Sequence, residues 1–374
     1  YIYSVHGVQV TSRKDKLENI YLNNQDANYS KNSKKTLVEN ISFSINAHLV
    51  SDVPLSIFLS SGIDSNLIAY LAKKKHNSKL FAQTLSVNSL TGSKYDEEIL
   101  AKKTASKLGL DINIKRADSK LIKEDSENIL KIMDQPSVDG LNIYMLSKEV
   151  KAKKFKVSLV GTGADELLCG YSFYNSLPYI HHLRMNIFFK FMSKKINGAF
   201  KSTKLLKLFD TTLPCNDILD SYILQRSLRP PSSLLERYSK DEIIGAHKYI
   251  RNAIGTNVIN SRLNIRSKLM FFDQNFYLKN QLLRDCDWAS MSHSIEIRTP
   301  FVDKDILEFV LTNNLSHYKN IKKYIAKNEL INISSDFVKR KKTGFAIPDG
   351  SKSFNQNDYS QSLRDKQDFI YEIF

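Results

Sequence analysis

A short polar turn at residues 60–65 carries side chains well suited to chemistry. It reads Ser-Ser-Gly-Ile-Asp-Ser and follows an apolar run, Leu55 to Leu59, that has strand character. A helical pattern of apolar residues begins directly after the turn. The first N–H groups of that helix would face the turn, and helix starts of this kind bind anions, phosphates above all. The sequence therefore predicts a phosphate site, with a plain tight turn as the alternative.

The side chains of the turn fit an anionic ligand. Ser60, Ser61 and Ser65 bring hydroxyl donors, and Gly62 allows a ligand to approach the backbone closely. The turn lacks the Gly-Lys-Ser/Thr ending of the Walker-type loop, which argues against an ordinary P-loop kinase.

A second turn, within residues 157–171, has a similar construction. A strand-like run leads into Gly161 and Gly163, and two acids follow at Asp165 and Glu166. Carboxylates are hard oxygen donors suited to magnesium. Alternatively, these acids only favour the start of a helix. Beside a phosphate loop the magnesium interpretation gains weight, because triphosphate chemistry needs Mg²⁺, which Asp64 and Asp165 could bind.

A third polar segment lies near the end of the chain. Residues 340–345, Arg-Lys-Lys-Thr-Gly-Phe, place cations beside a flexible glycine. In isolation, this run of charges would be interpreted as a solvated surface.

The elements around these turns predict an α/β fold. Strand-like runs alternate with helical patterns up to about residue 170, which indicates a doubly wound parallel sheet. Ligands of such sheets bind beyond the carboxyl ends of the strands, where the serine-rich turn lies. After residue 175 the patterns are mainly helical, including the segment 262–290. The expected strands are 55–59, 80–87, 110–114 and 156–160, and the expected early helices are 36–50 and 96–108.

Composition is that of an ordinary globular protein. Of the 374 residues, 42% are hydrophobic and 25% charged. No segment is long and apolar enough for a membrane span, and no signal peptide is evident. The three cysteines have no metal-ligand spacing, so we expect reduced thiols and a cytoplasmic protein. The net charge of +16 is spread along the chain, and nucleic acid is not the expected main partner.

Four motifs, in order, resemble the asparagine synthetase family. They run from the first turn to the late lysine motif, over about residues 36 to 348, and Tyr95-Asp96-Glu97 also fits. Together they are far more specific than any one of them. The matching segments are Ser60–Ser65; Gly161–Glu166 with Gly170-Tyr171; Asp287, Ser290-Met291 and Ser294–Asp303; and Lys342–Phe345.

The resemblance implies a synthetase domain with a pyrophosphate-loop ATPase fold that uses ATP and Mg²⁺. Asp64 and Asp165 would bind the metal, while Lys342, Asp165 and Glu166 would serve catalysis, with Lys342 steadying charge on the phosphates. Leu59 and Val87 would line the adenine site. The implied nucleotide-binding set is Leu59, Ser60, Ser61, Gly62, Asp64, Ser65, Val87, Gly161 and Thr162.

The chain departs from the family pattern at three places. Ser61 replaces a usual glycine, which we expect to be tolerated unless the position needs a positive φ. Thr162 stands where asparagine synthetases commonly have glutamate, and threonine cannot act as a general base at neutral pH. Another group, such as Glu166 or water, would then handle the proton, or the acceptor is not aspartate. The segment 134–144, where the family builds its acceptor pocket, also resembles divergent members.

These features predict the synthetase half of an amidotransferase. Residues 1–35 are expected to be the linker from a glutaminase domain, followed by an α/β core at 36–175 and a mainly helical part at 176–374. The chain would adenylate a small-molecule carboxylate, aspartate first, and transfer ammonia derived from glutamine. A sugar uronate or peptide carboxylate is the alternative acceptor, and a tRNA-modifying protein is the alternative of another class. No membrane partner is expected, and a homodimer is left open. A scaffold without catalysis is a last alternative, because of Thr162.

Overall fold

The computed structural model describes most of the chain. It covers residues 13–27, 33–75, 80–88, 91, 96–133, 137, 140–196, 203–227, 229–317 and 321–339.

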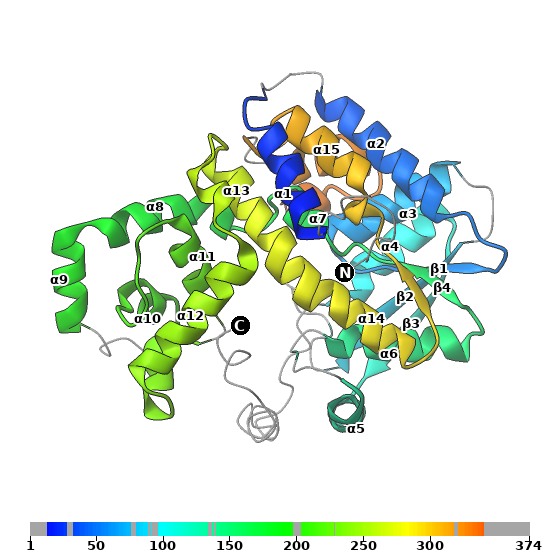
Figure 1. Ribbon diagram of the computed structural model, residues 1–374. Helices are drawn as coiled ribbons and strands as arrows, with labels where there is room; N and C mark the ends of the chain where they lie inside the picture. Colours follow the sequence, from blue (N-terminus) through cyan, green and yellow to red (C-terminus); the bar gives the residue numbers. More distant parts are fainter. Residues whose placement is uncertain are drawn as a thin grey trace, which may run out of the picture.

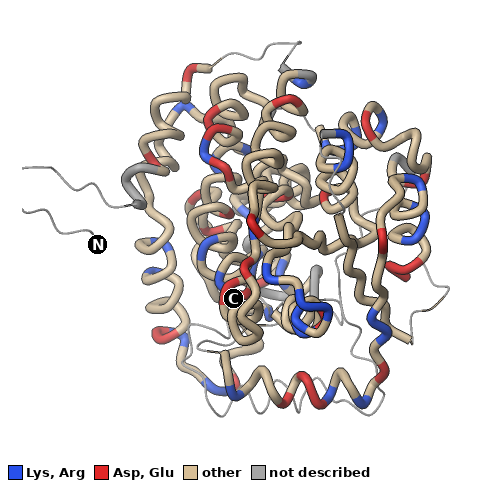
Figure 2. The backbone as a smooth tube through the Cα atoms, turned by 90° about the vertical axis from the view of Figure 1, so that its right-hand side faces the viewer, with Lys and Arg blue, Asp and Glu red and all other residues tan. Residues whose placement is uncertain are grey.

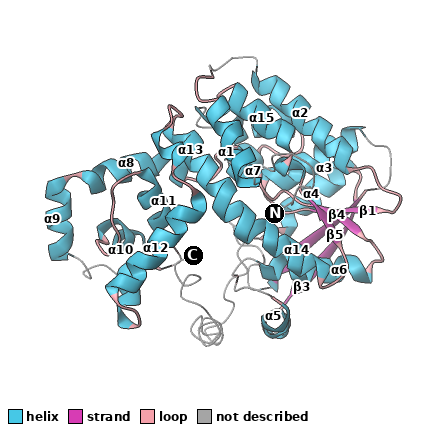
Figure 3. Ribbon diagram, viewed as in Figure 1, coloured by secondary structure: helices cyan, strands magenta, loops and turns pink. Residues whose placement is uncertain are grey.

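A five-stranded parallel sheet forms the centre of the α/β part (Figure 3). Its order is β3-β2-β1-β4-β5. The four strands predicted from the sequence are confirmed, with small shifts at their ends. The strands are β1 (Leu55–Phe58), β2 (Phe81–Val87), β3 (Asp111–Ala117), β4 (Val157–Leu159) and β5 (Glu296–Arg298).

The fifth strand was not predicted. We had assigned its residues to the mainly helical part at 176–374, but they belong to the sheet. β5 pairs with β4 in parallel, with Ser158 opposite Ile297. It is only three residues long, and a charged residue flanks Ile297 on each side. Its sequence therefore has no apolar run that would indicate a strand.

Helices cover both faces of the sheet, which confirms the doubly wound architecture (Figure 1). Neighbouring residues of β1 show the two faces: Ile57 belongs to one hydrophobic cluster and Phe58 to the other. Successive strand side chains point to opposite faces, so both faces of β1 are buried. The first cluster includes helices α2 (Ser33–His48), α3 (Ile63–Lys75) and α4 (Glu98–Leu108), and the second α5 (Ser119–Ile132), α6 (Gly140–Ala152) and α14 (Leu283–Met291).

The strand order places a topological switch between β1 and β4. From β1 the sheet continues to β2 and β3 on one side, and to β4 and β5 on the other. At such a point the connections diverge and leave a crevice at the carboxyl ends of the two strands. The two glycine-containing turns follow those strands, so the fold brings them together.

The part after residue 176 is mainly helical, as predicted, and its helices up to residue 254 form the lobe at the left of Figure 1. A helical rod of α13 (Ile265–Phe272), a π-helical stretch (Asp273–Leu282) and α14 leads from this lobe to the sheet (Figure 1). The other helices are α7 (Ala164–Leu167), α8 (Phe173–Met185), α9 (Ile187–Ile196), α10 (Thr203–Phe209), α11 (Ile218–Arg226), α12 (Lys240–Ile254), α15 (Lys304–Thr312), α16 (Ile321–Ile325) and α17 (Asp336–Lys339), with short 3-10 or π-helical segments at Pro231–Glu236, Asn257–Asn260, Pro300–Val302, Leu315–His317 and Ala326–Leu330.

The expected linker at residues 1–35 contains a helix of the folded body. In α1 (Arg13–Asn23), Tyr21 is fully buried, and its ring packs edge-on against Phe271 at a centroid distance of 5.1 Å. One hydrophobic cluster reaches from Tyr21 to Phe337. The helical part and the first face of the sheet therefore share a core.

Candidate active site

The serine-rich turn is held in its conformation by hydrogen bonds from its own side chains. Ser60 Oγ accepts a hydrogen bond from Gly62 N–H at 3.1 Å and lies 2.8 Å from Ser65 Oγ. Asn66 Nδ2 donates to the carbonyls of Gly62 (2.6 Å) and Ser60 (2.8 Å). Ser61 is absent from the described residues with positive φ, so serine is accommodated there without strain.

Glu97 contacts this turn, a role that we did not assign from the sequence. Its carboxylate accepts the backbone N–H of Ser61, one of the groups that would face a phosphate. Glu97 is buried at the start of α4. An acidic side chain therefore occupies a position where the turn is expected to bind phosphate.

The two expected metal ligands, Asp64 and Asp165, converge on the ammonium group of Lys322. Lys322 Nζ lies 2.6 Å from Asp64 Oδ2 and 2.5 Å from Asp165 Oδ1. The three side chains are only 13–22% exposed. Burial opposes the charge of Lys322, but the carboxylates of Asp165 and Asp64 outweigh it and raise its pKa above the usual value. The two turns thus form one cation-binding point.

This point fits a magnesium ion that also binds phosphate. Mg²⁺ prefers oxygen ligands and is commonly held by one or two carboxylates plus substrate phosphates. The described residues contain no group of three or more histidine, cysteine or acidic side chains that could hold a metal on their own. Asp64 and Asp165, which already share a cation, match the arrangement in which carboxylates and substrate phosphates bind Mg²⁺ together.

Two glycines allow this close packing. A Cβ atom on Gly161 would lie 3.0 Å from Asp64 Cβ and 3.2 Å from Ser65 N, so glycine brings the second turn against the first. A Cβ atom on Gly170 would lie 1.9 Å from Asp165 Oδ1 and 2.9 Å from Lys322 Cδ.

Glu166 points to a different set of partners from its neighbour Asp165. Its Oε1 accepts the Tyr171 hydroxyl at 2.5 Å, and the residue is 1% exposed. Burial, together with the negative charges of Asp165 and Asp273, raises the pKa of Glu166 to about 7. Contact with a ligand is therefore not evident for Glu166, and its catalytic role stays a prediction.

The region of the expected acceptor pocket lies against α14. Thr162 Oγ1 is 3.6 Å from Cys286 Sγ, and burial raises the pKa of Cys286 to about 12, so this thiol stays neutral. Ser137 donates to the buried carboxylate of Asp285, which also accepts Trp288 Nε1–H at 3.0 Å. The motifs had drawn attention to Asp287, whose side chain is exposed. The single tryptophan was the available signal for this cluster.

Trp288 fixes the beginning of α6. A Cβ atom on Gly140 would lie 2.2 Å from Trp288 Cζ2, so only glycine permits this packing. The other residues of the acceptor segment include 134–136 and 138–139, which lie outside the described residues.

The remaining predicted site residues are less directly placed. Leu59 and Val87 are buried in the two hydrophobic clusters, and their adenine role stays a prediction. Lys342 and the rest of the 340–345 segment lie outside the described residues.

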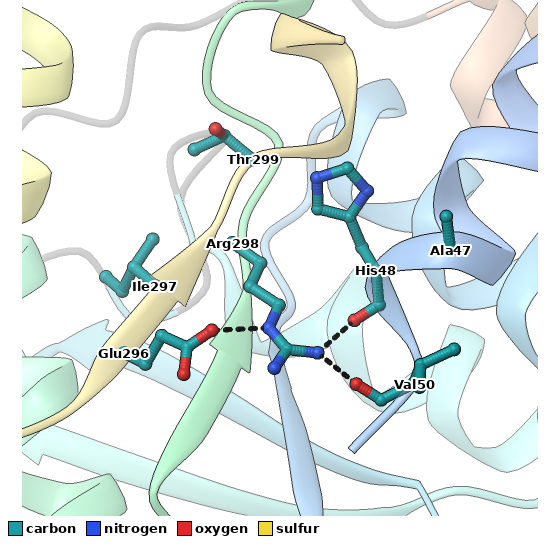
Figure 4. Close-up of a pocket in the computed structure, with 7 residues that line it drawn as sticks. All are labelled: Ala47, His48, Val50, Glu296, Ile297, Arg298 and Thr299. Carbon is teal, nitrogen blue, oxygen red and sulfur yellow. Dashed lines mark hydrogen bonds and ion pairs between the residues drawn. The ribbon is translucent and has the colours of Figure 1, made fainter.

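A pocket of about 480 Å³ opens beside β5, and its lining includes no residue of the two glycine-containing turns (Figure 4). Arg298 spans it, pairing with Glu296 at 2.6 Å and donating to the carbonyls of His48 (2.7 Å) and Val50 (2.6 Å). Arg298 thus links β5 to the end of α2, which is a structural role.

Comparison with known proteins agrees with the geometry. The model of the asparagine synthase family matches residues 36–368. The chain belongs to the asparagine synthase family. Among its relatives, asparagine synthetase [glutamine-hydrolyzing] 1 of Bacillus subtilis is 28% identical over 315 residues, covering 82% of this chain and 48% of the relative. Asparagine synthetase 3 of that organism is 24% identical over 348 residues, covering 87% and 50%.

A more diverse set also shares parts of the chain. The amidase chyE of Penicillium rubens is 30% identical over 151 residues, covering 37% of this chain and 22% of the relative. Among solved structures, an NH3-dependent NAD synthetase of Campylobacter jejuni covers 37% of this chain and 61% of its own, at 21% identity and a TM-score of 0.27. The U34-tRNA thiolase NcsA of Methanococcus maripaludis covers 73% and 82%, at 16% identity and a TM-score of 0.29.

The chain spans about half the length of the two synthetases that it matches. None of the helices in the described ranges is long and apolar enough to cross a membrane. Along the described backbone, basic and acidic residues are interspersed (Figure 2), as expected from the sequence.

Proposed function

We propose that this chain is the synthetase part of an ATP-dependent amide-forming ligase. The supporting observation is the convergence of Asp64 and Asp165 on one cation beside the serine-rich turn. This point lies at the carboxyl ends of β1 and β4, the ligand-binding edge of a doubly wound sheet. ATP binding and ligase chemistry at this edge agree with membership of the asparagine synthase family.

The proposed reaction begins with activation of a carboxylate. A carboxylate oxygen attacks the α-phosphate of ATP, which forms an acyl-adenylate and releases pyrophosphate. The N–H groups and hydroxyls of residues 60–65 would hold the pyrophosphate. Asp64 and Asp165 would hold Mg²⁺, which neutralises charge on the phosphates when bound. Lys342 would add a further positive charge.

Amide formation completes the reaction. Ammonia attacks the activated carbonyl, and AMP leaves. We propose that the ammonia derives from glutamine, supplied by a glutaminase domain of the same protein or of a separate subunit. The enzyme would act in the cytoplasm.

Aspartate is the first candidate acceptor, and a sugar uronate or peptide carboxylate is the second. Thr162 favours keeping the second candidate, because it replaces the glutamate that asparagine synthetases commonly have. It lies against the neutral thiol of Cys286, so this pair provides no base for the attacking amine.

The activity is tested by exchange of labelled pyrophosphate into ATP in the presence of a candidate acid. We expect acid-dependent exchange in the wild type and a loss of about 10²–10³-fold in Asp64→Asn, the size seen when one charge-stabilising group is removed from an active site. Asp26→Asn, at an exposed position, is the matched control. Unchanged exchange in Asp64→Asn would refute the proposed site.

The acceptor is tested separately by AMP release with aspartate, uronates and peptide acids. Aspartate-dependent AMP release would identify an asparagine synthetase, while release with another acid would identify the second candidate. Trp288 provides a direct binding signal, because the only tryptophan packs against Gly140 within the acceptor segment. Salt-sensitive tRNA binding without acid-dependent exchange would instead support the tRNA-modifying alternative.

A further inference from the structure

Lys322 occupies the position that a metal ion would need between Asp64 and Asp165. Its Nζ lies 2.5–2.6 Å from an oxygen of each carboxylate. A magnesium ion binds its oxygen ligands at about 2.0–2.1 Å, so an ion shared by the same oxygens would overlap the ammonium group. The repulsion between two cations adds to this conflict.

The packing around Lys322 holds its side chain in this position. Its side chain is 13% exposed, and its Cδ lies where a side chain at position 170 would begin, 2.9 Å from a hypothetical Cβ on Gly170. The same Cβ would overlap Asp165 Oδ1. Gly170 thus leaves the space in which Asp165 and Lys322 meet.

We propose that Lys322 closes the metal site until nucleotide arrives, so that the divalent cation binds only together with ATP. The inference rests on the proposed function, since it assigns an order of binding to the same site. Displacing the ammonium group from two shielded carboxylates is costly. The phosphates of ATP provide the alternative anionic partners that Lys322 needs when it leaves. Free metal provides none.

Binding of Mn²⁺ in the absence of nucleotide tests this directly, because Mn²⁺ is visible by electron paramagnetic resonance. We expect no bound Mn²⁺ in the wild type and a new site in Lys322→Met, with affinity at least about tenfold higher, which corresponds to 1.4 kcal/mol. The new site should disappear in Lys322→Met/Asp165→Asn. Lys323→Met, which removes the neighbouring exposed lysine, should behave as the wild type.

Two results would overturn the proposal: equally tight Mn²⁺ binding by the wild type and Lys322→Met, or absence of a new site in a folded Lys322→Met protein. Lys322→Gln serves as the second variant if Lys322→Met fails to fold. The measurement on the wild type tests the predicted absence of bound Mn²⁺ whether or not the variants fold. Because the experiment contains no nucleotide or acid, its failure is distinct from a failure of pyrophosphate exchange.

Discussion

Two buried sets of charged side chains in this protein differ in how many carboxylates share one cation. At the nucleotide edge, Asp64 and Asp165 share one ammonium group, that of Lys322. In the helical lobe, one carboxylate, Asp273, accepts two hydrogen bonds from Arg226, at 2.8 and 2.6 Å. The three groups named in the first set are two carboxylates and one ammonium, and the second pairs one carboxylate with one guanidinium.

The lobe set is also enclosed by further donors and rings. Asp273 is fully buried and accepts the hydroxyls of Tyr174 (2.6 Å) and Tyr222 (2.7 Å). The Arg226 guanidinium lies 3.8 Å from the ring centroid of Tyr277 and 4.6 Å from that of Tyr171. A permanent structural charge is satisfied on every side, whereas a binding site keeps carboxylates that can exchange one cation for another.

The largest effect on stability is expected from Asp273→Asn. It leaves Arg226 buried beside a neutral partner, and loss of one member of a buried ion pair costs about 3–5 kcal/mol. Urea unfolding measures this change. Asp26→Asn, in the exposed pair with Arg262, should change the free energy of unfolding by less than about 1 kcal/mol. A comparably small loss in both variants would contradict the interpretation of Asp273 and Arg226 as a buried, stabilising ion pair.

Glu166 lies between the sets and should make stability depend on pH. Its pKa is raised from 4.5 to about 7, so folded Glu166 is neutral at pH values where the unfolded side chain is ionised. The folded state therefore binds more protons, and stability falls as the pH rises from 4.5 towards 7, by at most about 3 kcal/mol. Glu166→Gln keeps an acceptor for Tyr171 and should abolish this dependence. Parallel unfolding curves for both proteins against pH would contradict the assignment.

A smaller loss of stability is expected when a side chain at position 170 fills the space beside Lys322. Gly170→Ala forces its Cβ against Asp165, and overpacking of this kind costs about 1–3 kcal/mol. Gly245→Ala is the matched control within α12, because its Cβ would meet no atom within 4 Å. It should stabilise the protein by about 0.5–1 kcal/mol, since glycine is unfavourable inside a helix. Thermal unfolding of both variants measures the difference.

The smallest effect is expected from Glu97→Gln. The change removes a negative charge beside the N–H of Ser61, with which an incoming phosphate competes. A hydrogen bond to a charged group contributes about 1.5–3 kcal/mol and one between neutral groups about 1, so ATP binding should tighten by roughly 1 kcal/mol. Calorimetry measures the affinity. Weaker ATP binding would show that Glu97 supports the ligand instead of competing with it.

The sequence alone determined the fold class and the pairing of the two turns. Strand, turn and helix signals are local, and the parallel order of such units brings the turns after residues 59 and 160 to one edge. Asp64 and Asp165 could therefore be predicted as one site. The strand β5 escaped prediction because three residues around Ile297 carry no periodic signal.

Only the tertiary structure decided which side chains complete this site. Lys322 lies 258 positions from Asp64, beside another lysine, and nothing in its local sequence distinguishes it. Glu97 belongs to a motif that fits the family, but its contact with Ser61, which spans 36 positions, could not be predicted from that motif. Such partners are chosen by the packing of distant elements, here through the space left by Gly170, and packing has no signature in a short stretch of sequence.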